Sequence, residues 1–390
     1  MHLARKVDRQ LLAPKAFYFL FYAAGAALFP YLVLYYNGVG LHTSQIGILL
    51  AIGPLVTLIA APVWGGIADY THRHKLVMFV AVVGAMSMVA AISQTSAFWA
   101  LVPVVLVYAW FSAPIVPLAD NAVLSLLGSR SDEYGKQRMW GAVGWGISGL
   151  LAGIAIDVYG QSYSFVGYIF FLGFGLIAIS RIPLSEGSVS TPFWSGLKIL
   201  ARNARWLYFL MAMLLTGIGY GVNFQFLFLY LDSLGASGTL MGWTLMIATI
   251  SEVPIFFYSD YLLLKLGASG LMLVSMFVST LRLLAYALMP NAWYALALAA
   301  FHGLSFSARW AAGVSYSNRE APPGLGATAQ GLFTGASMGL GTAGGALLGG
   351  VLFDTWGPRA AFASAAAVAA CGMAIFIVSE MAFGKKMAYR

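Results

Sequence analysis

The segment Ser112–Gly153 reads SAPIVPLADNAVLSLLGSRSDEYGKQRMWGAVGWGISGLLAG, and it joins two long apolar runs through a polar bend. Asp120 lies in the first run and Arg138 begins the second, so helices that meet at the bend can bring these opposite charges together. Trp145 follows Arg138 by two helical turns and shares roughly the same face. This wall is suited to a polar solute with one flat apolar side. The alternative is an ion pair that only staples two helices at the surface.

Composition places the chain among membrane proteins. Of its 390 residues, 61% are hydrophobic and only 9% are charged, whereas a soluble domain carries about 25% charged residues. Repeated apolar runs of about twenty residues predict an all-α protein that crosses a bilayer many times. The single cysteine, Cys371, excludes an internal disulfide. No Walker sequence or hydrolase motif occurs, so we expect neither an ATP-driven pump nor an enzyme.

The apolar runs predict twelve transmembrane helices in two six-helix halves. The longest polar segment between spans, 182–204, is rich in Pro, Ser and Gly before its basic residues, and it reads as a cytoplasmic linker. It would separate a first bundle, residues 1–181, from a second, residues 205–390. The predicted spans are 14–37, 43–70, 75–95, 98–127, 135–158, 162–181, 205–233, 238–260, 268–289, 291–317, 326–353 and 358–380.

The distribution of basic residues predicts orientation. Of 21 lysines and arginines, 17 fall at the two termini or in loops after even-numbered spans, and only Arg359 lies in a loop on the other side. By the positive-inside rule, both termini are cytoplasmic. We expect the protein to reside in the plasma (inner) membrane. Topology thus accounts for the net charge of +8, and we expect no nucleic-acid partner. The 17 residues are Arg5, Lys6, Arg9, Lys15, Arg73, Lys75, Arg130, Lys136, Arg181, Lys198, Arg202, Arg205, Lys265, Arg319, Lys385, Lys386 and Arg390.

The two halves echo each other. The stretch Trp64–Lys75 at the end of the second span corresponds to Tyr258–Lys265 at the end of the eighth. Asp69 and Asp260 in these stretches are 191 residues apart, close to half the chain. The fifth and eleventh spans are both rich in glycine, which lets helix backbones approach closely. This correspondence favours a duplicated architecture, as in secondary transporters.

These features resemble the major facilitator superfamily over nearly the whole chain. The segment Gly65–Lys75 is similar to that family's cytoplasmic signature, in which glycine, a small residue and aspartate precede basic residues; His72 replaces a family glycine. The resemblance implies a twelve-helix major facilitator fold that works by alternating access. It also implies a cytoplasmic gate formed by Gly65, Asp69, Arg73, Lys75 and Asp260.

Within that superfamily, the segment Tyr134–Trp145 is similar to the group that contains lactose permease, nucleoside–proton symporters and phenylpropionate permeases. In lactose permease an acid on the fourth span, with an arginine and a tryptophan on the fifth, binds sugar. The resemblance carries these roles to Asp120, Arg138 and Trp145. Aspartate here replaces a glutamate, which shortens the reach by one methylene and weakens the expectation of a galactoside substrate.

Spans 8 to 10, in the second half, carry Glu252, Arg282, His302 and Arg309 away from their ends. Each such residue costs roughly 2.5–3.5 kcal/mol to insert, so we expect partners. Glu252 and Arg309 each lie eight residues from the cytoplasmic end of their spans, which predicts that they pair. Arg282 would then lie near His302, and a Glu252–Arg282 pair remains open. A static ion pair that only fixes helices is the alternative to a functional role.

The same resemblance assigns substrate binding and proton coupling to this second group. Arg282 and His302 are separated by 20 residues, as the resemblance requires, but Ser305 stands where lactose permease has the glutamate that carries the proton. Either Glu252 or His302 carries the proton, or coupling is absent; we favour Glu252, with Arg309 as its movable partner.

Three further residues of the cavity-facing spans, Tyr22, Asn223 and Trp310, complete the predicted substrate site. His72 and His74 have poor spacing for a metal site, so we expect no metal and no cofactor apart from the coupling proton. The expected partners are a small-molecule solute and the lipid bilayer, and we expect a monomer.

The sequence therefore predicts proton-coupled symport of a small polar organic solute, with a sugar or nucleoside first. An aromatic carboxylate is the second candidate, because the predicted cavity holds more arginines than free acids. An exporter or uniporter of the same fold is a further alternative. A membrane receptor that transports nothing is the alternative from another class.

Overall fold

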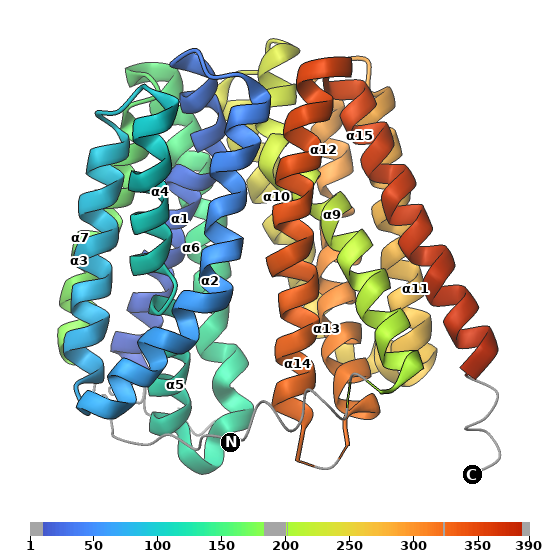
Figure 1. Ribbon diagram of the computed structural model, residues 1–390. Helices are drawn as coiled ribbons and strands as arrows, with labels where there is room; N and C mark the ends of the chain where they lie inside the picture. Colours follow the sequence, from blue (N-terminus) through green and yellow to red (C-terminus); the bar gives the residue numbers. More distant parts are fainter. Residues whose placement is uncertain (1–10, 183–199, 201, 323, 384–390) are drawn as a thin grey trace, which may run out of the picture.

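The computed structural model describes residues 11–182, 200, 202–322 and 324–383, and these form a bundle of long helices (Figure 1). No β-strand occurs among the described residues. The prediction of an all-α membrane fold is confirmed. Ten helical segments of the described chain are long and apolar enough to cross a bilayer.

The first half of the chain forms one group of helices. The helix is interrupted between α4 and α5, because Pro114 lacks the N–H that would continue it. The two short helices follow each other directly and together make one span. Its members are α1 (Leu12–Gly38), α2 (Thr43–Thr71), α3 (His74–Ile92), α4 (Phe98–Ser112), α5 (Ile115–Leu127), the 3₁₀ turn η2 (Gly128–Glu133), α6 (Tyr134–Tyr159) and α7 (Tyr163–Arg181).

The second half forms the other group. Two of its elements, α11 and α15, each consist of two helices joined at a glycine. Gly267 in α11 and Gly357 in α15 adopt positive φ values of 67° and 79°, which interrupt the helix. With α12 and α13 as one broken span, and α15 divided at Gly357, the described helices are consistent with twelve crossings. The members are α9 (Ala204–Ser233), α10 (Gly238–Phe257), α11 (Ser259–Leu288), α12 (Tyr294–Ala299), α13 (His302–Glu320), α14 (Gly326–Thr334), the π-helical η3 (Gly335–Gly341) and α15 (Thr342–Phe383).

The predicted linker, 182–204, lies largely outside the described residues, since 183–199 and 201 are not described. The assignment of residues 1–181 and 205–390 to separate domains therefore stays a prediction. Asp260, which the sequence placed at the end of the eighth span, lies in the first turn of α11.

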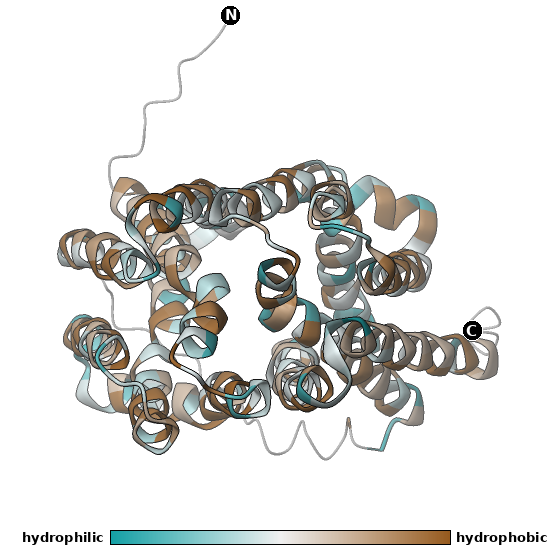
Figure 2. Ribbon diagram, turned by 90° about the horizontal axis from the view of Figure 1, so that it is seen from above, coloured by the Kyte–Doolittle hydropathy of each residue, from teal (hydrophilic) through white to brown (hydrophobic). Residues whose placement is uncertain are grey.

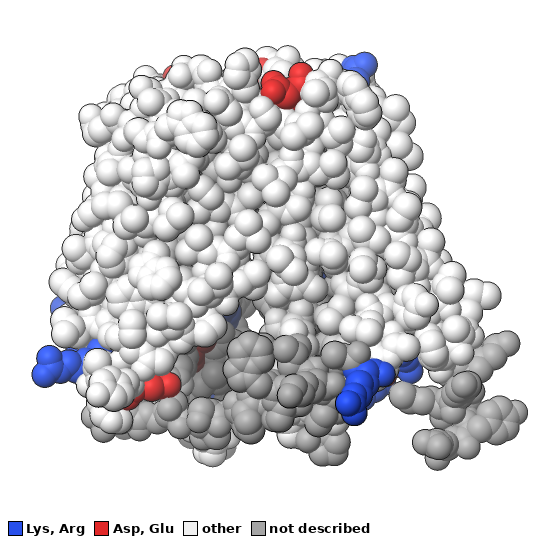
Figure 3. Space-filling view, in the orientation of Figure 1, with Lys and Arg blue, Asp and Glu red and all other residues white. Residues whose placement is uncertain are grey.

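The two halves stand side by side, and Figure 2 shows many hydrophobic residues on the outward faces of their helices. Large apolar side chains such as Ile59, Phe170 and Val378 are more than half exposed there, which suits a surface surrounded by lipid. We call the end of the bundle where α1 begins and α15 ends the terminal end, and the other the opposite end. Figure 3 shows lysine and arginine mainly at the terminal end of one face.

Glycines bring the halves together toward the opposite end. α6 packs against α10, and a Cβ added at Gly153 would lie only 2.1 Å from the carbonyl oxygen of Gly238. α2 packs against α15, where a Cβ at Gly47 would lie 2.4 Å from the carbonyl oxygen of Ala346. The predicted role of glycine in close helix approach thus falls at the contact between the halves.

Candidate functional site

The first wall of the site joins α1, α5 and α6. Nη1 of Arg138 lies 3.9 Å from Oδ1 of Asp120, and the hydroxyl of Tyr18 donates a 2.7 Å hydrogen bond to the same oxygen. Both charged side chains remain about one third exposed, at 34% and 27%. The structure therefore brings together the two residues that the sequence singled out, at a place that solvent reaches.

Two tyrosines of α1 hold the guanidinium in place. Cζ of Arg138 lies 4.8 Å from the ring centroid of Tyr22 and 5.4 Å from that of Tyr18, within the range of cation–π attraction. Gly141 makes room, since a Cβ there would lie 2.5 Å from the Tyr22 ring. Sequence reasoning found Tyr22 but missed Tyr18. Their spacing of four residues, which places both on one helix face, was the available signal.

Trp145 reaches across to the second half. Its ring stacks on Phe224 of α9 with centroids 6.2 Å apart and planes 22° apart. The stacking continues from Phe224 to Tyr220 at 5.8 Å, and from Tyr220 to Phe306 of α13 at 5.5 Å. Phe306 in turn lies 5.3 Å from the ring of His302. We call Trp145, Phe224, Tyr220, Phe306, His302 and Trp310 the aromatic column; Trp310 lies 6.5 Å from Phe306.

Glu252 of α10 pairs with His302 of α13, with Oε1 and Nε2 3.4 Å apart. The predicted pairing of Glu252 with Arg309 is wrong, because the ion pair that Glu252 forms among the described residues is with the histidine. The reason is helix register. A Cβ at Gly303 would lie 2.0 Å from the carbonyl oxygen of Ser251, and the Gly303 N–H donates a 2.8 Å hydrogen bond to the Ser251 hydroxyl. This close approach places the neighbouring residue of each helix, His302 and Glu252, side by side.

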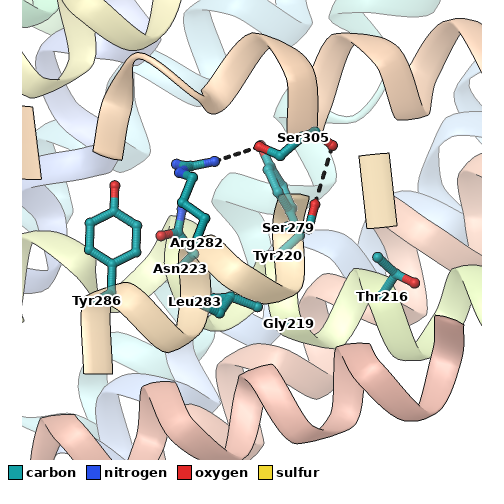
Figure 4. A pocket seen from close by; sticks show the side chains of 9 residues that line it. All are labelled: Thr216, Gly219, Tyr220, Asn223, Ser279, Arg282, Leu283, Tyr286 and Ser305. Carbon is teal, nitrogen blue, oxygen red and sulfur yellow. Dashed lines mark hydrogen bonds between the residues drawn. The ribbon is translucent and has the colours of Figure 1, made fainter. Parts of the chain in front are cut away.

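A pocket opens between α9, α11 and α13 (Figure 4). Its lining residues are Thr216, Gly219, Tyr220, Asn223, Ser279, Arg282, Leu283, Tyr286 and Ser305. Nη1 of Arg282 donates a 2.6 Å hydrogen bond to the Ser305 hydroxyl, which itself donates to the carbonyl oxygen of His302 at 3.0 Å. The expected nearness of Arg282 and His302 thus arises through Ser305, the residue that replaces the family's acid.

Arg309 lies deep beside this pocket and is only 2% exposed. Its Cζ lies 4.9 Å from the ring centroid of Tyr220, and Nη1 lies 3.5 Å from the carbonyl oxygen of Thr216. Tyr220 and Thr216 both line the pocket, so the guanidinium stands directly behind its wall. Asn223, which the sequence also singled out, lines the same pocket and is buried.

The predicted gate residues lie apart from this site, at the terminal end of α2 and α3. Asp69 lies 3.7 Å from Nε2 of His74, and Lys75 donates to the backbone carbonyl of Ser180 on α7. Within the described chain these contacts stay inside the first half, so the structure does not join the predicted gate to Asp260 of the other half. His72 adopts a left-handed conformation, with φ 53°, where the family has glycine.

Two other predicted gate residues lie close to these contacts in sequence. Arg73 is the exposed residue that precedes α3, and Gly65 lies within α2. A Cβ added at Gly65 would have no heavy atom within 4 Å, so this glycine permits no close helix approach in the present conformation. The gating role of the whole set stays a prediction.

This architecture defines a membrane transporter of the major facilitator type, with two helical halves and charged residues from both facing a shared centre. Comparison with known proteins gives the family. Residues 11–364 match the family described as "MFS_1 like family", and the chain belongs to it. It is an integral membrane protein of a family of small-molecule transporters, not enzymes.

Among curated relatives, the chain is 26% identical over 353 residues to the "Uncharacterized transporter YwbF" of Bacillus subtilis (strain 168), covering 90% of this chain and 88% of that one. It is 27% identical over 348 residues to the maltose permease of Geobacillus stearothermophilus, covering 87% of each. The crystal structure of the nucleoside transporter NupG superposes with a TM-score of 0.81 at 18% identity, over 95% of this chain and 98% of that one. This last likeness concerns the fold alone.

Proposed function

We propose that the protein imports a small polar organic solute together with protons, by alternating access. The observation that carries this proposal is the Glu252–His302 pair, 3.4 Å apart, at one end of the aromatic column. The column's other end is Trp145, beside the wall that holds Asp120 and Arg138. Charged groups of both halves therefore face one site. When the halves move, the distances between these groups change, and this can couple solute binding to the movement.

Glu252 is the proposed proton carrier. A carboxylate and an imidazole at this distance can hold or exchange one proton. Ser305 cannot carry a proton, so the role that the resemblance gives to an acid at that position passes to Glu252. Arg309, two helical turns along α13 from His302, contributes positive charge that influences the pair's proton affinity.

For orientation we propose that the terminal end, where the basic residues gather, faces the cytoplasm, and that the membrane is the plasma (inner) membrane. The glycine contacts between α6 and α10 run from Gly153 to Gly146, in the part of α6 nearer the opposite end. The halves would then be closed toward the outside and the site would face the cytoplasm. Function as a monomer is part of the same proposal.

The solute class rests first on relatives that act on sugar and nucleoside, the maltose permease by sequence and NupG by fold. A ring-bearing polar solute suits a site that combines charged groups with stacked rings. An aromatic carboxylate is the second candidate, favoured by the arginines of the second half. Export, uniport and receptor function are the outcomes that the experiment has to separate.

The test begins with a thermal-shift screen of the purified protein against sugars, nucleosides and aromatic acids, followed by uptake of each hit into liposomes. We expect an inward proton gradient to drive accumulation and an uncoupler to abolish it. Glu252→Gln should retain exchange of solute across the membrane but lose accumulation. Asp232→Asn, which neutralises an exposed carboxylate at the far end of α9, is the matched control.

Uptake that is unchanged by the uncoupler would show that transport is not coupled to protons and would indicate a uniporter. Release of solute from within that draws protons into the vesicle and makes the outside alkaline, with no uptake under an inward gradient, would indicate export by proton antiport. Binding without transport by the wild-type protein in either direction would indicate a receptor.

A further inference from the structure

The pocket between α9, α11 and α13 holds one arginine beside several hydroxyl groups and one amide, and it carries no carboxylate among its lining residues. Arg282 points along its wall, and Ser279, Ser305, Tyr286 and Asn223 supply hydroxyl and amide groups (Figure 4). A pocket with this composition is complementary to a ligand that accepts hydrogen bonds and carries negative charge.

The two arginines at this pocket, Arg282 and Arg309, differ from two other arginines of the helices, Arg138 and Arg205. Arg138 faces Asp120, and Arg205 forms ion pairs with Glu320 at 3.2 Å and Glu380 at 2.9 Å. Arg282 has a serine hydroxyl and Arg309 a distant backbone carbonyl, and within the described chain neither forms an ion pair with a carboxylate. Of these four arginines of the described chain, only the two at this pocket lack a carboxylate partner.

These unpaired charges carry a free-energy cost that a bound anion would offset. A cationic side chain at the centre of a membrane helix is costly, and buried charges in proteins are normally paired. Nε of Arg282 and Nη2 of Arg309 are buried and have no hydrogen-bond partner. The same holds for the hydroxyl of Tyr286, which can donate to an anion. Polar atoms left unsatisfied around one pocket indicate a ligand that completes them.

Charge and shape narrow the class of ligand. The site's three arginines (Arg138, Arg282 and Arg309) face two carboxylates, Asp120 and Glu252, so one positive charge remains when His302 is neutral. A monoanion would balance it. A planar carboxylate fits the fork of a guanidinium, and Tyr220, which lines the pocket, belongs to the aromatic column that a ring could contact.

We propose that this pocket binds the carboxylate of a ring-bearing organic acid, with Arg282 and Arg309 neutralising its charge. The inference rests on the proposed function as a solute transporter. The contents of this pocket favour the second solute class of that proposal, a carboxylate, over the neutral sugar or nucleoside that the relatives suggest. The ring lies toward the aromatic column, and the carboxylate lies toward α11 and α13.

The test compares matched pairs of probes that differ in charge alone as far as chemistry allows: phenylacetate with 2-phenylethanol, and glucuronate with glucose. Binding to the purified full-length protein is measured by titration calorimetry and thermal shift, with no proton gradient present. We expect one carboxylate to bind at least tenfold more tightly than its neutral partner, and the pair that shows this identifies the ring type. Equal response to both members of each pair, including no response, overturns the proposal.

Variants assign the preference to the two arginines. Arg282→Gln and Arg309→Gln should each remove the tenfold preference, while Arg282→Lys and Arg309→Lys, which keep the charge, should retain part of it and show that the fold is intact. Arg359→Gln, at an exposed arginine of the opposite end, is the matched control and should bind as the wild type does. A preference that survives both glutamine variants overturns the assignment.

Two further arms separate this inference from other outcomes. Stabilisation by chloride or phosphate alone, equal to that by the carboxylate, would show an inorganic anion site and overturn the proposal. Transport of a neutral solute with no carboxylate preference would leave the proposed transport function standing and remove this inference. Tight carboxylate binding without transport would support this inference and contradict the proposed transport function.

Discussion

The carboxylate of Asp157, at the end of α6, accepts a 2.6 Å hydrogen bond from the backbone N–H of Gly238, at the start of α10 in the other half. It also accepts from the N–H and hydroxyl of Thr239. A similar contact lies across the bundle, where Asp354 of α15 accepts a 2.9 Å hydrogen bond from Ser44 at the start of α2. In both places an acid of one half meets a helix N-terminus of the other, where the helix dipole favours negative charge.

Asp157 is therefore expected to hold the opposite end of the bundle closed. Asp157→Ala removes the acceptor that α6 offers to the start of α10, while Ser237 still caps that helix. A loss of about 1 kcal/mol, as for other acceptors at helix N-termini, should shift the population toward the state open at that end roughly fivefold. Spin labels at Ser162 and Asp232, in a Cys371→Ser background, would report the separation of the two halves. Arg359→Gln should leave the distance distribution unchanged. An unaltered distribution in Asp157→Ala would show that the acid does not hold the two halves together.

A second prediction concerns Gly153, whose added Cβ would collide with the Gly238 carbonyl oxygen at 2.1 Å. Because that atom belongs to rigid backbone, Gly153→Ala should force the halves apart at the opposite end and slow any cycle that requires closure there. Gly66→Ala is the matched control, since nothing lies within 4 Å of a Cβ at that helical position. The same pair of labels should lengthen its mean distance in the first variant only. Normal closure in Gly153→Ala would show that this glycine contact does not control the separation of the halves.

The fold and the first wall could be predicted because they depend on local features. Apolar run length sets the spans, and Asp120 and Arg138 approach because consecutive helices meet at one short bend. The stacking of Trp145 on Phe224 could not be predicted, since it depends on how two halves distant in sequence pack. The sequence predicted that α6 and α9 both exist, but it could not predict how they are rotated relative to each other.

The second wall shows where residue counting fails. Equal distances of Glu252 and Arg309 from their helix ends suggested a pair, yet the Gly303–Ser251 contact sets α10 and α13 in a different register. Glu252 consequently meets His302, and Arg309 is left without an acid among the described residues. The lack of a carboxylate partner for Arg282 and Arg309 in the described chain is thus a property of three-dimensional packing, although the short supply of acids was visible in the sequence.

A third prediction addresses stability. Arg205 of α9 bridges Glu320 of α13 and Glu380 of α15, and Tyr316 donates a 2.8 Å hydrogen bond to Glu380. Arg205→Ala would strand two carboxylates in a mostly buried place, so we expect a loss of about 3–5 kcal/mol in the free energy of unfolding. Thermal unfolding in detergent measures this, with Arg202→Ala as the exposed control. A melting temperature equal to the wild type's would show that water or rearrangement compensates for the lost guanidinium.

The last prediction decides whether the Asp120–Arg138 wall binds solute or only joins two helices. Tyr18→Phe removes the 2.7 Å hydrogen bond to Asp120 and leaves the ring beside Arg138, so packing is kept while the carboxylate loses a donor. If the wall binds solute, the loss of a bond worth about 1 kcal/mol should weaken solute affinity severalfold with little change in melting temperature. If the wall is a staple, the melting temperature should fall and affinity should stay. Tyr159→Phe, at an exposed tyrosine on α6 far from the wall, provides the baseline for a hydroxyl lost without consequence.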